Sequence, residues 1–163
     1  FGSTASTLLH RSPCPVLTGA HLDRSADAAD ELEINRILCA LDLLAESDKV
    51  LDSAAELAAR FGAELVLLHV VPGTEALPDR QIDCELRGHL LKQAKEQLLA
   101  IASNHGVNAT ILTEAGSIAP TVENIAIASS ADLIVIGRNG EHPWWEHNSY
   151  GIARRAPCAV LSI

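Results

Sequence analysis

Segments typical of buried strands alternate with segments typical of helices along residues 34–163, and this alternation limits the fold more than any other feature. The strand-type segments are short runs rich in Val, Ile and Leu, separated by longer stretches with apolar residues at helical spacing. The expected strands are residues 35–42, 64–71, 107–114, 132–137 and 159–163. Strands that alternate with helices pair in parallel through right-handed crossovers. The sequence therefore predicts an α/β domain, Rossmann-like in architecture, with an open five-stranded parallel sheet and helices on both faces.

The segments between these strands carry signals for the start and end of helices. Ser47 is placed to cap a helix that ends at Gly62, and Gly116-Ser117 precedes another helix. A long helix between these two stops at Gly106. The residues expected on the inward face of the first helix are Val50, Ala54, Leu57, Ala58 and Phe61.

A short motif occurs twice in the chain. HRSPCPVLT at residues 10–18 returns as RRAPCAVLS at residues 154–162, an offset of 144 residues (154 − 10). An offset of one domain length indicates that the chain starts with the end of a second copy of the domain. Polar and acidic residues without apolar periodicity then form a linker. We therefore expect three parts: the tail of a preceding domain in residues 1–18, a linker in residues 19–33, and the domain itself in residues 34–163.

The composition excludes several classes of function. The formal net charge is −9, which repels a phosphate backbone, so nucleic acid is not an expected partner. The longest apolar runs fall far short of the roughly 20 residues that cross a bilayer, and the first residues lack a signal-peptide pattern. We therefore expect a cytoplasmic protein that does not contact the membrane. The sequence has no methionine and begins inside a structural element, so we also expect a fragment of a longer protein.

The four cysteines, Cys14, Cys39, Cys84 and Cys158, form no CxxC pair. We expect them to be buried free thiols. Cys39 and Cys158 lie in apolar, strand-like runs, and we expect both to be reduced and slow to react because apolar surroundings disfavour the thiolate.

The topology also locates a candidate site. In open parallel sheets, ligands bind beyond the carboxyl ends of the strands, where the strand order reverses. The residues expected there are Asp42, Val70 with Val71, Gly116 and the loop that starts at Gly137.

Several motifs occur together in a fixed order. Asp42 ends the first strand, His69-Val70-Val71 ends the second, Gly116 precedes the third helix, and DLIVIG-x-x-G is followed by APC-x-V-L. With these features residues 34–163 resemble the universal stress protein family, and residues 2–18 resemble the end of another such domain. The resemblance implies the sheet order 3-2-1-4-5. In one branch of the family it implies ATP bound by a loop of the form G-x2-G-x9-G-[S/T], with the aspartate and the second-strand valine at the adenosine.

The resemblance therefore assigns cofactor-binding positions, and these are Asp42, Val70, Gly116, Gly137 and Gly140. Glycines in such a loop let backbone N–H groups approach the phosphates. The first half of the loop is present, but nine residues further on the chain has Tyr150-Gly151 in place of Gly followed by Ser or Thr.

Alignment through the repeat gives the same result. Gly2-Ser3, which fits the ATP-binding pattern, corresponds to Glu146 and His147, as if the loop were four residues shorter (150 − 146). Glu141 and Glu146 would repel a triphosphate, and Arg138 would offset this only in part. We therefore predict a degenerate adenine-nucleotide site and no cofactor in this chain. ATP binding is the alternative.

Other side chains have a structural and a functional interpretation. Glu141, His142, Glu146 and His147 are chemically suited to zinc, and we interpret them as a surface coincidence, not a metal site. Trp144 and Trp145 can pack, stack on a ligand or anchor an interface, and we favour packing. His69 is interpreted as a hydrogen-bonded core or cleft histidine, and Asp42 serves either adenosine recognition or the following turn.

These observations predict a non-enzymatic universal stress protein module with a regulatory or scaffolding role in the stress response. The alternative is an ATP-binding, weakly hydrolysing universal stress protein. An adenylate-forming or nucleotide-hydrolysing enzyme, or a flavin module, would need a glycine-rich loop after the first strand, and DLLAESD at residues 42–48 contains no glycine. We expect no catalytic residues. The sequence does not identify the stress signal or a downstream protein partner.

The last strand, residues 159–163, is expected at the edge of the sheet, where unpaired N–H and C=O groups attract another strand. The family resemblance implies that two domains meet through this edge. We therefore expect residues 15–18 to add as an antiparallel edge strand, because the domains should be related by an approximate two-fold axis. Tandem pairing within one chain and homodimer pairing between two chains both fit the sequence.

Overall fold

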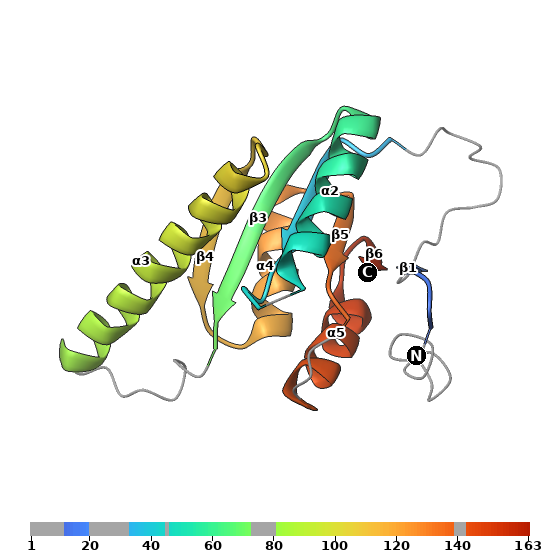
Figure 1. Cartoon of the computed structure of the whole chain (residues 1–163). Coiled ribbons are helices and arrows are strands. Elements are labelled where there is room, and N and C mark those ends of the chain that lie inside the picture. The colour runs from blue at the N-terminus through green and yellow to red at the C-terminus, as the bar shows by residue number, and fades with distance from the viewer. Residues whose placement is uncertain (1–11, 20–32, 45, 73–80, 139–142) are drawn as a thin grey trace.

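The computed structural model describes residues 12–19, 33–44, 46–72, 81–138 and 143–163. In these residues a six-stranded sheet carries helices on both of its faces (Figure 1). The strands are β1 (Val16–Gly19), β2 (Arg36–Ala40), β3 (Glu64–Val71), β4 (Thr110–Ala115), β5 (Leu133–Ile136) and β6 (Ala159–Ser162). The helices are α2 (Ser47–Phe61), α3 (Gln81–Asn104), α4 (Ile118–Ser129) and α5 (Pro143–Arg155).

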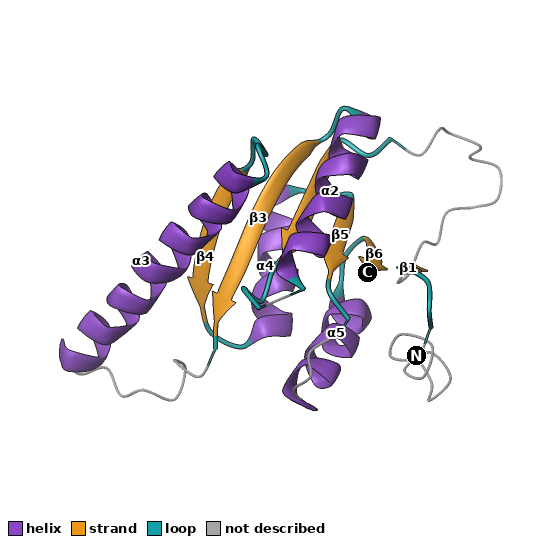
Figure 2. Cartoon of the chain, in the orientation of Figure 1, coloured by secondary structure: helices purple, strands orange, loops and turns teal. Residues whose placement is uncertain are grey.

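The sheet has the strand order β1-β6-β5-β2-β3-β4. All neighbours pair in parallel except β1 and β6, which are antiparallel. Without β1 this is the predicted order 3-2-1-4-5, so the predicted fold class is confirmed together with the extra edge strand (Figure 2).

The central strands are buried on both faces, which explains their continuous apolar sequences. Ile37 and Cys39 of β2 point into a core that they share with α2 and α3, whereas Leu38 points into a core shared with α4 and α5. All three are fully buried. The same alternation along β3 and β5 places the sheet between two apolar layers.

The first helix differs in detail from the prediction. Ser47 is its first residue, not its cap, and Glu46 takes the cap position without a side-chain hydrogen bond. Gly62 ends the helix in the left-handed conformation (φ 66°), as predicted, and its N–H donates to the Ala58 carbonyl. Phe61 was expected in the core but is 44% exposed, because the last helical turn lies over an open groove that Phe61 itself lines.

Two strand boundaries also differ from the prediction. The third predicted strand begins at Thr110 and not at residue 107, because the Val107 N–H still bonds to the Ala102 carbonyl at the end of α3. The fourth predicted strand begins at Leu133 and not at Asp132. The Oδ2 atom of Asp132 instead accepts hydrogen bonds from the N–H groups of Asn35 and Arg36. Asp132 therefore fixes where β2 enters the sheet.

All four cysteines are free thiols, as expected, but their burial varies. Cys39 is buried, and burial raises the pKa of its thiol. Cys158 is half-buried, since it precedes β6 instead of lying within it; burial and the charge of Asp132 raise its pKa to about 11. Cys14 and Cys84 are exposed, which corrects the expectation that they are buried. Cys84 lies in the first turn of α3, which projects beyond the sheet (Figure 1).

Strand β1 joins the edge of the sheet next to β6, as predicted for this segment. An offset of 144 residues relates the two copies of the sequence motif and makes Leu17 the counterpart of Leu161. These two residues pair with each other across the strands. On either side of this pair, Val16 pairs with Ser162, the counterpart of Thr18, and Thr18 pairs with Val160, the counterpart of Val16. A pairing in which i meets j and j meets i is the pattern of a two-fold axis, which here lies at the Leu17–Leu161 pair.

We predict that removing β1 exposes the β6 edge. A chain shortened to residues 20–163 should be less soluble and less stable than the full chain, because unpaired backbone groups and Leu161 become accessible. Light scattering and urea unfolding measure the two effects. Removal of residues 1–11 alone is the matched control, since it leaves β1 in place. Identical behaviour of all three proteins would show that β1 contributes nothing.

His105 connects the turn after α3 to the outer face of α2. Its Nδ1 lies 2.7 Å from Asp52 Oδ1, and its Nε2 lies 3.2 Å from Asp48 Oδ1. The hydrogen bond to Asp52, with a smaller contribution from Asp48, raises the pKa of His105 above its ordinary value of 6.5. The protonated imidazole therefore joins two elements that are distant in sequence.

We predict that this connection makes stability depend on pH. Because the folded-state pKa is raised, the contribution is fully present below about pH 6.5 and is lost as the pH rises through the raised value. The difference in urea midpoint between wild type and His105→Gln should therefore be larger in mild acid than in mild alkali. His89→Gln, at an exposed histidine of α3, is the control. A difference that does not change with pH would contradict the prediction.

Candidate functional site

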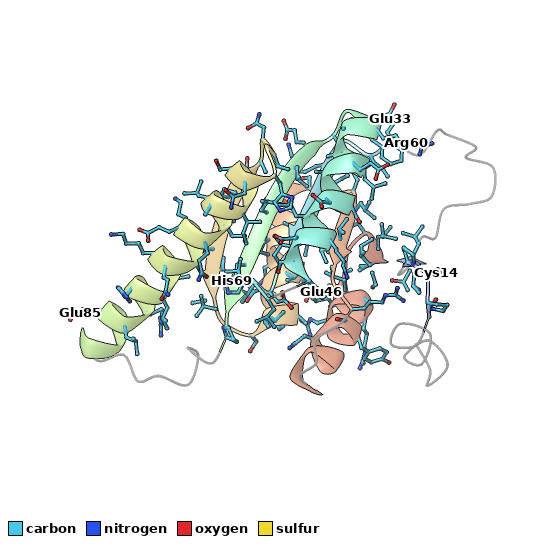
Figure 3. The ribbon with its side chains drawn as sticks, viewed as in Figure 1. Cys14, Glu33, Glu46, Arg60, His69 and Glu85 are labelled. Carbon is cyan, nitrogen blue, oxygen red and sulfur yellow. The ribbon has the colours of Figure 1, made fainter. Side chains whose placement is uncertain are left out.

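The carboxyl ends of β2, β3 and β5 form the end of the sheet where the candidate residues gather. Asp42 follows β2, Val70 lies near the end of β3, and Gly137 follows β5. The Gly116 N–H donates to the Val71 carbonyl at 3.0 Å, which places the start of α4 at the same end. Gly140, the fifth candidate, lies outside the described residues. Figure 3 labels Glu46 and His69 at this end of the molecule.

Asp42 holds the turn between β2 and α2. Its Oδ1 accepts hydrogen bonds from the Leu44 N–H at 2.9 Å and from the Ser47 hydroxyl at 2.8 Å. Leu43, which lies between Asp42 and Leu44 in the chain, has φ 62°, a left-handed conformation that is unfavourable for a non-glycine residue. The two hydrogen bonds stabilise this turn. Asp42 therefore stabilises the turn that follows β2, which is the structural role expected for it, and Ser47 is one of its hydrogen-bond partners.

His69 is a hydrogen-bonded cleft histidine, as the sequence indicated. Its Nδ1 lies 2.8 Å from the Leu41 carbonyl, which can only accept, so Nδ1 carries the proton. Burial lowers the pKa of His69, although the Leu41 carbonyl and the nearby Asp42 oppose this shift. The neutral ring connects the ends of β2 and β3 and provides no fixed positive charge for a phosphate.

A small cavity lies between the ends of β2 and β5. The described residues around it, which include Asp42, Ser47, Val50 and Gly137, enclose a cavity of about 10 Å³. That volume holds about one water molecule, whereas small-molecule sites usually measure about 300–1,000 Å³. A Cβ at Gly137 would lie 3.2 Å from Val50 Cγ2. Gly137 therefore allows Val50 to approach the chain closely at this point.

Polar groups beside Gly137 are also engaged within the protein. The Arg138 guanidinium Nη1 donates to the Ser12 carbonyl at 2.8 Å, and its N–H donates to the Ile163 carbonyl at 3.1 Å. The buried Ser149 hydroxyl donates to the Gly137 carbonyl at 3.2 Å. Arg138, expected to offset repulsion of a triphosphate, instead binds the segment that leads into β1.

The segment after this loop corrects another expectation. Residues 141–147 were interpreted as a loop, but α5 begins at Pro143. The side chains of Trp144, Trp145 and the neighbouring His and Glu residues lie outside the described part of the structure. Among the side chains that are described, no group of three or more His, Cys, Asp or Glu residues could hold a metal ion.

Sequence reasoning missed two residues of this site. Val50 was assigned to the core by its helical spacing, but no signal placed it against Gly137 at the site. Ser149 lies two positions after His147, and its hydroxyl was not considered. Its position in the middle of an apolar helical face, between the buried Ile152 and the loop, was the available signal.

The strand order and the helices on both faces of the sheet define a Rossmann-like α/β domain. The universal stress protein family matches residues 33–163, and the chain belongs to this family. No curated protein matches the chain. No helix among the described residues is long and apolar enough to cross a membrane.

Solved structures share the fold at low sequence identity. The protein MJ0577 is 20% identical with a TM-score of 0.69, and the match covers 80% of this chain and 96% of that one. A universal stress protein from Archaeoglobus fulgidus DSM 4304 is 22% identical with a TM-score of 0.66, and the match covers 99% of this chain but 54% of that one. A universal stress protein solved in complex with cAMP is 18% identical with a TM-score of 0.58, covering 80% and 97% of the two chains. The whole chain, including β1, thus matches about half of a longer protein.

We predict that Asp42 is needed for stability even without a ligand. Asp42→Ala removes both hydrogen bonds of the turn and should lower the free energy of unfolding by about 1–2 kcal/mol. Ser47→Ala removes one of the two and should lower it by about half as much. Urea unfolding measures both. Unchanged stability in Asp42→Ala would show that the turn does not depend on this carboxylate.

Proposed function

We propose that residues 34–163 form a non-enzymatic universal stress protein module whose adenine-nucleotide site has degenerated, and which acts in a regulatory or scaffolding role. One observation supports the proposal: beside Asp42 and Gly137, two of the positions that the family resemblance assigns to the nucleotide, the described residues enclose a cavity of only about 10 Å³. Adenosine is many times larger than this cavity. Binding would require Val50 and the start of α2 to move away from Gly137.

The charges support the same proposal. The solved complex with cAMP shows that a relative with this fold binds a nucleotide. In this chain, the cation next to the first glycine is bound to the Ser12 carbonyl, and Glu141 and Glu146 add negative charge by sequence. A phosphate would therefore lose an attractive partner and gain repulsive ones.

We further propose that residues 1–18 are the end of a preceding domain of the same family, followed by a linker in residues 19–33. The two-fold pattern of the β1–β6 register and the match to half of a longer relative support this organisation. A module that pairs through its last strand can position a neighbouring domain, either in tandem or in a homodimer. Such pairing would not require a nucleotide.

The second candidate function is ATP binding with weak hydrolysis. The sequence Gly2-Ser3 favours it for the preceding domain, since this pair fits the final element of the phosphate loop. For residues 34–163 the same element falls on Glu146 and His147. The two candidates therefore assign different roles to the two domains.

We predict that calorimetric titration of the full chain with ATP shows no binding at micromolar concentrations. The universal stress protein solved with cAMP, titrated with cAMP, provides the positive control. A dissociation constant in the micromolar range or tighter would overturn the proposal.

Two variants separate the two proposed reasons why ATP does not bind. Val50→Ala removes the methyl group nearest Gly137, whereas Glu141→Gln with Glu146→Gln removes the two negative charges. Because the cavity itself is too small, the charge variant should remain unable to bind ATP. Binding gained by the charge variant alone would show that repulsion, not Val50, keeps the nucleotide out.

A further inference from the structure

A groove of about 430 Å³ lies on the α2 side of the sheet, at the amino ends of β2, β5 and β6. Its apolar lining includes Leu17, Ile34, Leu57, Phe61, Leu133 and Leu161. Figure 3 labels Glu33, which lines it, and Arg60 at this end, opposite the end that carries Glu46 and His69. The groove is therefore separate from the candidate nucleotide site.

The size and lining of the groove fit a small molecule. Its volume falls within the range of about 300–1,000 Å³ that is usual for small-molecule sites, which are concave and mostly apolar. Leu17 is 64% exposed and Phe61 is 44% exposed at its margins. Large apolar side chains that stay accessible around a concave surface mark a binding site more often than an accidental patch.

Both copies of the repeated motif contribute to this groove. Leu17 comes from β1 and Leu161 from β6, and these are the residues that pair at the two-fold axis. The groove thus crosses the junction between the paired strands and is complete only when β1 is in place. We call it the junction groove.

The polar lining of the junction groove is acidic. Glu33 and Asp132 are among its lining residues, and those that the structure describes include no lysine or arginine. Asp132 is held in place because its Oδ2 accepts two backbone N–H groups, and its negative charge contributes to the raised pKa of Cys158, which also lines the groove. Arg60 lies at the same end but does not line it. An apolar cavity with carboxylates favours a positively charged ligand.

We infer that the junction groove binds a small lipophilic cation, with an apolar ring system against Leu57 and Phe61 and an ammonium group near Glu33 and Asp132. This inference goes beyond the proposed function, because it concerns the amino ends of the strands and needs no nucleotide. Since Leu17 forms part of the groove, the ligand would stabilise the pairing of β1 with β6.

Two probes of equal size and opposite charge test the inference. 1-Naphthylmethylammonium and 1-naphthylacetate are titrated separately into the full, 15N-labelled chain, and amide shifts are followed by NMR. The cation should bind at least about tenfold more tightly than the anion, with shifts concentrated at Ile34, Leu57 and Leu161. It should also slow alkylation of Cys158, while the exposed Cys84 reacts at an unchanged rate.

Substitutions locate the site and its charge preference. Phe61→Ser should weaken binding of the cation about tenfold, whereas Ile127→Ser, at an exposed apolar residue of α4 outside the groove, should leave it unchanged. Glu33→Gln should reduce the preference for the cation. Leu17→Ser in the full chain should weaken binding without removal of β1.

Three results would overturn the inference. The first is that neither probe shifts the resonances of the groove. The second is that both probes bind equally and Glu33→Gln changes nothing. The third is that the groove resonances broaden with protein concentration in the absence of probe, which identifies the groove as an interface between copies. None of these results depends on ATP binding, so failure here and failure of the proposed function can be distinguished.

Discussion

The structure depends on the burial of both faces of β2 and β5 in the middle of the sheet. Leu38 and Ile134 point to one side, and Cys39 and Val135 to the other, with no exposed surface on any of the four. Helices must therefore cover both faces, and parallel neighbours require those helices as connections. This constraint gathers the carboxyl ends of three strands at one end of the molecule and their amino ends at the other.

The two ends of the sheet differ in the open space that the described residues leave. At the carboxyl ends, Val50 packs against Gly137 and Arg138 binds the Ser12 carbonyl, so both groups make contacts within the protein. At the amino ends, the last turn of α2 does not reach the sheet closely enough to bury Phe61, and a groove remains. Among the described residues, the groove of about 430 Å³ at the amino ends is larger than the cavity of about 10 Å³ beside Asp42 and Gly137.

The periodicity of the sequence was sufficient to predict the fold, because burial on two faces leaves long apolar runs and burial on one helical face leaves regular spacing. Boundaries and contacts between elements were harder to predict. Residue 107 has an apolar side chain, yet its N–H belongs to the end of α3. Phe61 has the correct spacing for the core, but spacing along a helix does not show where the sheet beneath it stops. The approach of Val50 to Gly137 depends on the distance between two elements, and one-dimensional patterns do not contain that distance.

The β1–β6 register shows how the two copies of the repeated motif meet. A repeat in sequence shows only that two segments had a common origin, and it does not show how they meet. The pairing of Leu17 with its own counterpart Leu161 adds this information, because a strand that paired merely to cover an edge would have no reason to choose the self-symmetric register. Arg138 supports the same contact, because it binds the residue that precedes β1 by four positions. The side chain that follows Gly137 therefore holds the segment leading into β1 and links this end of the sheet to the β1–β6 contact.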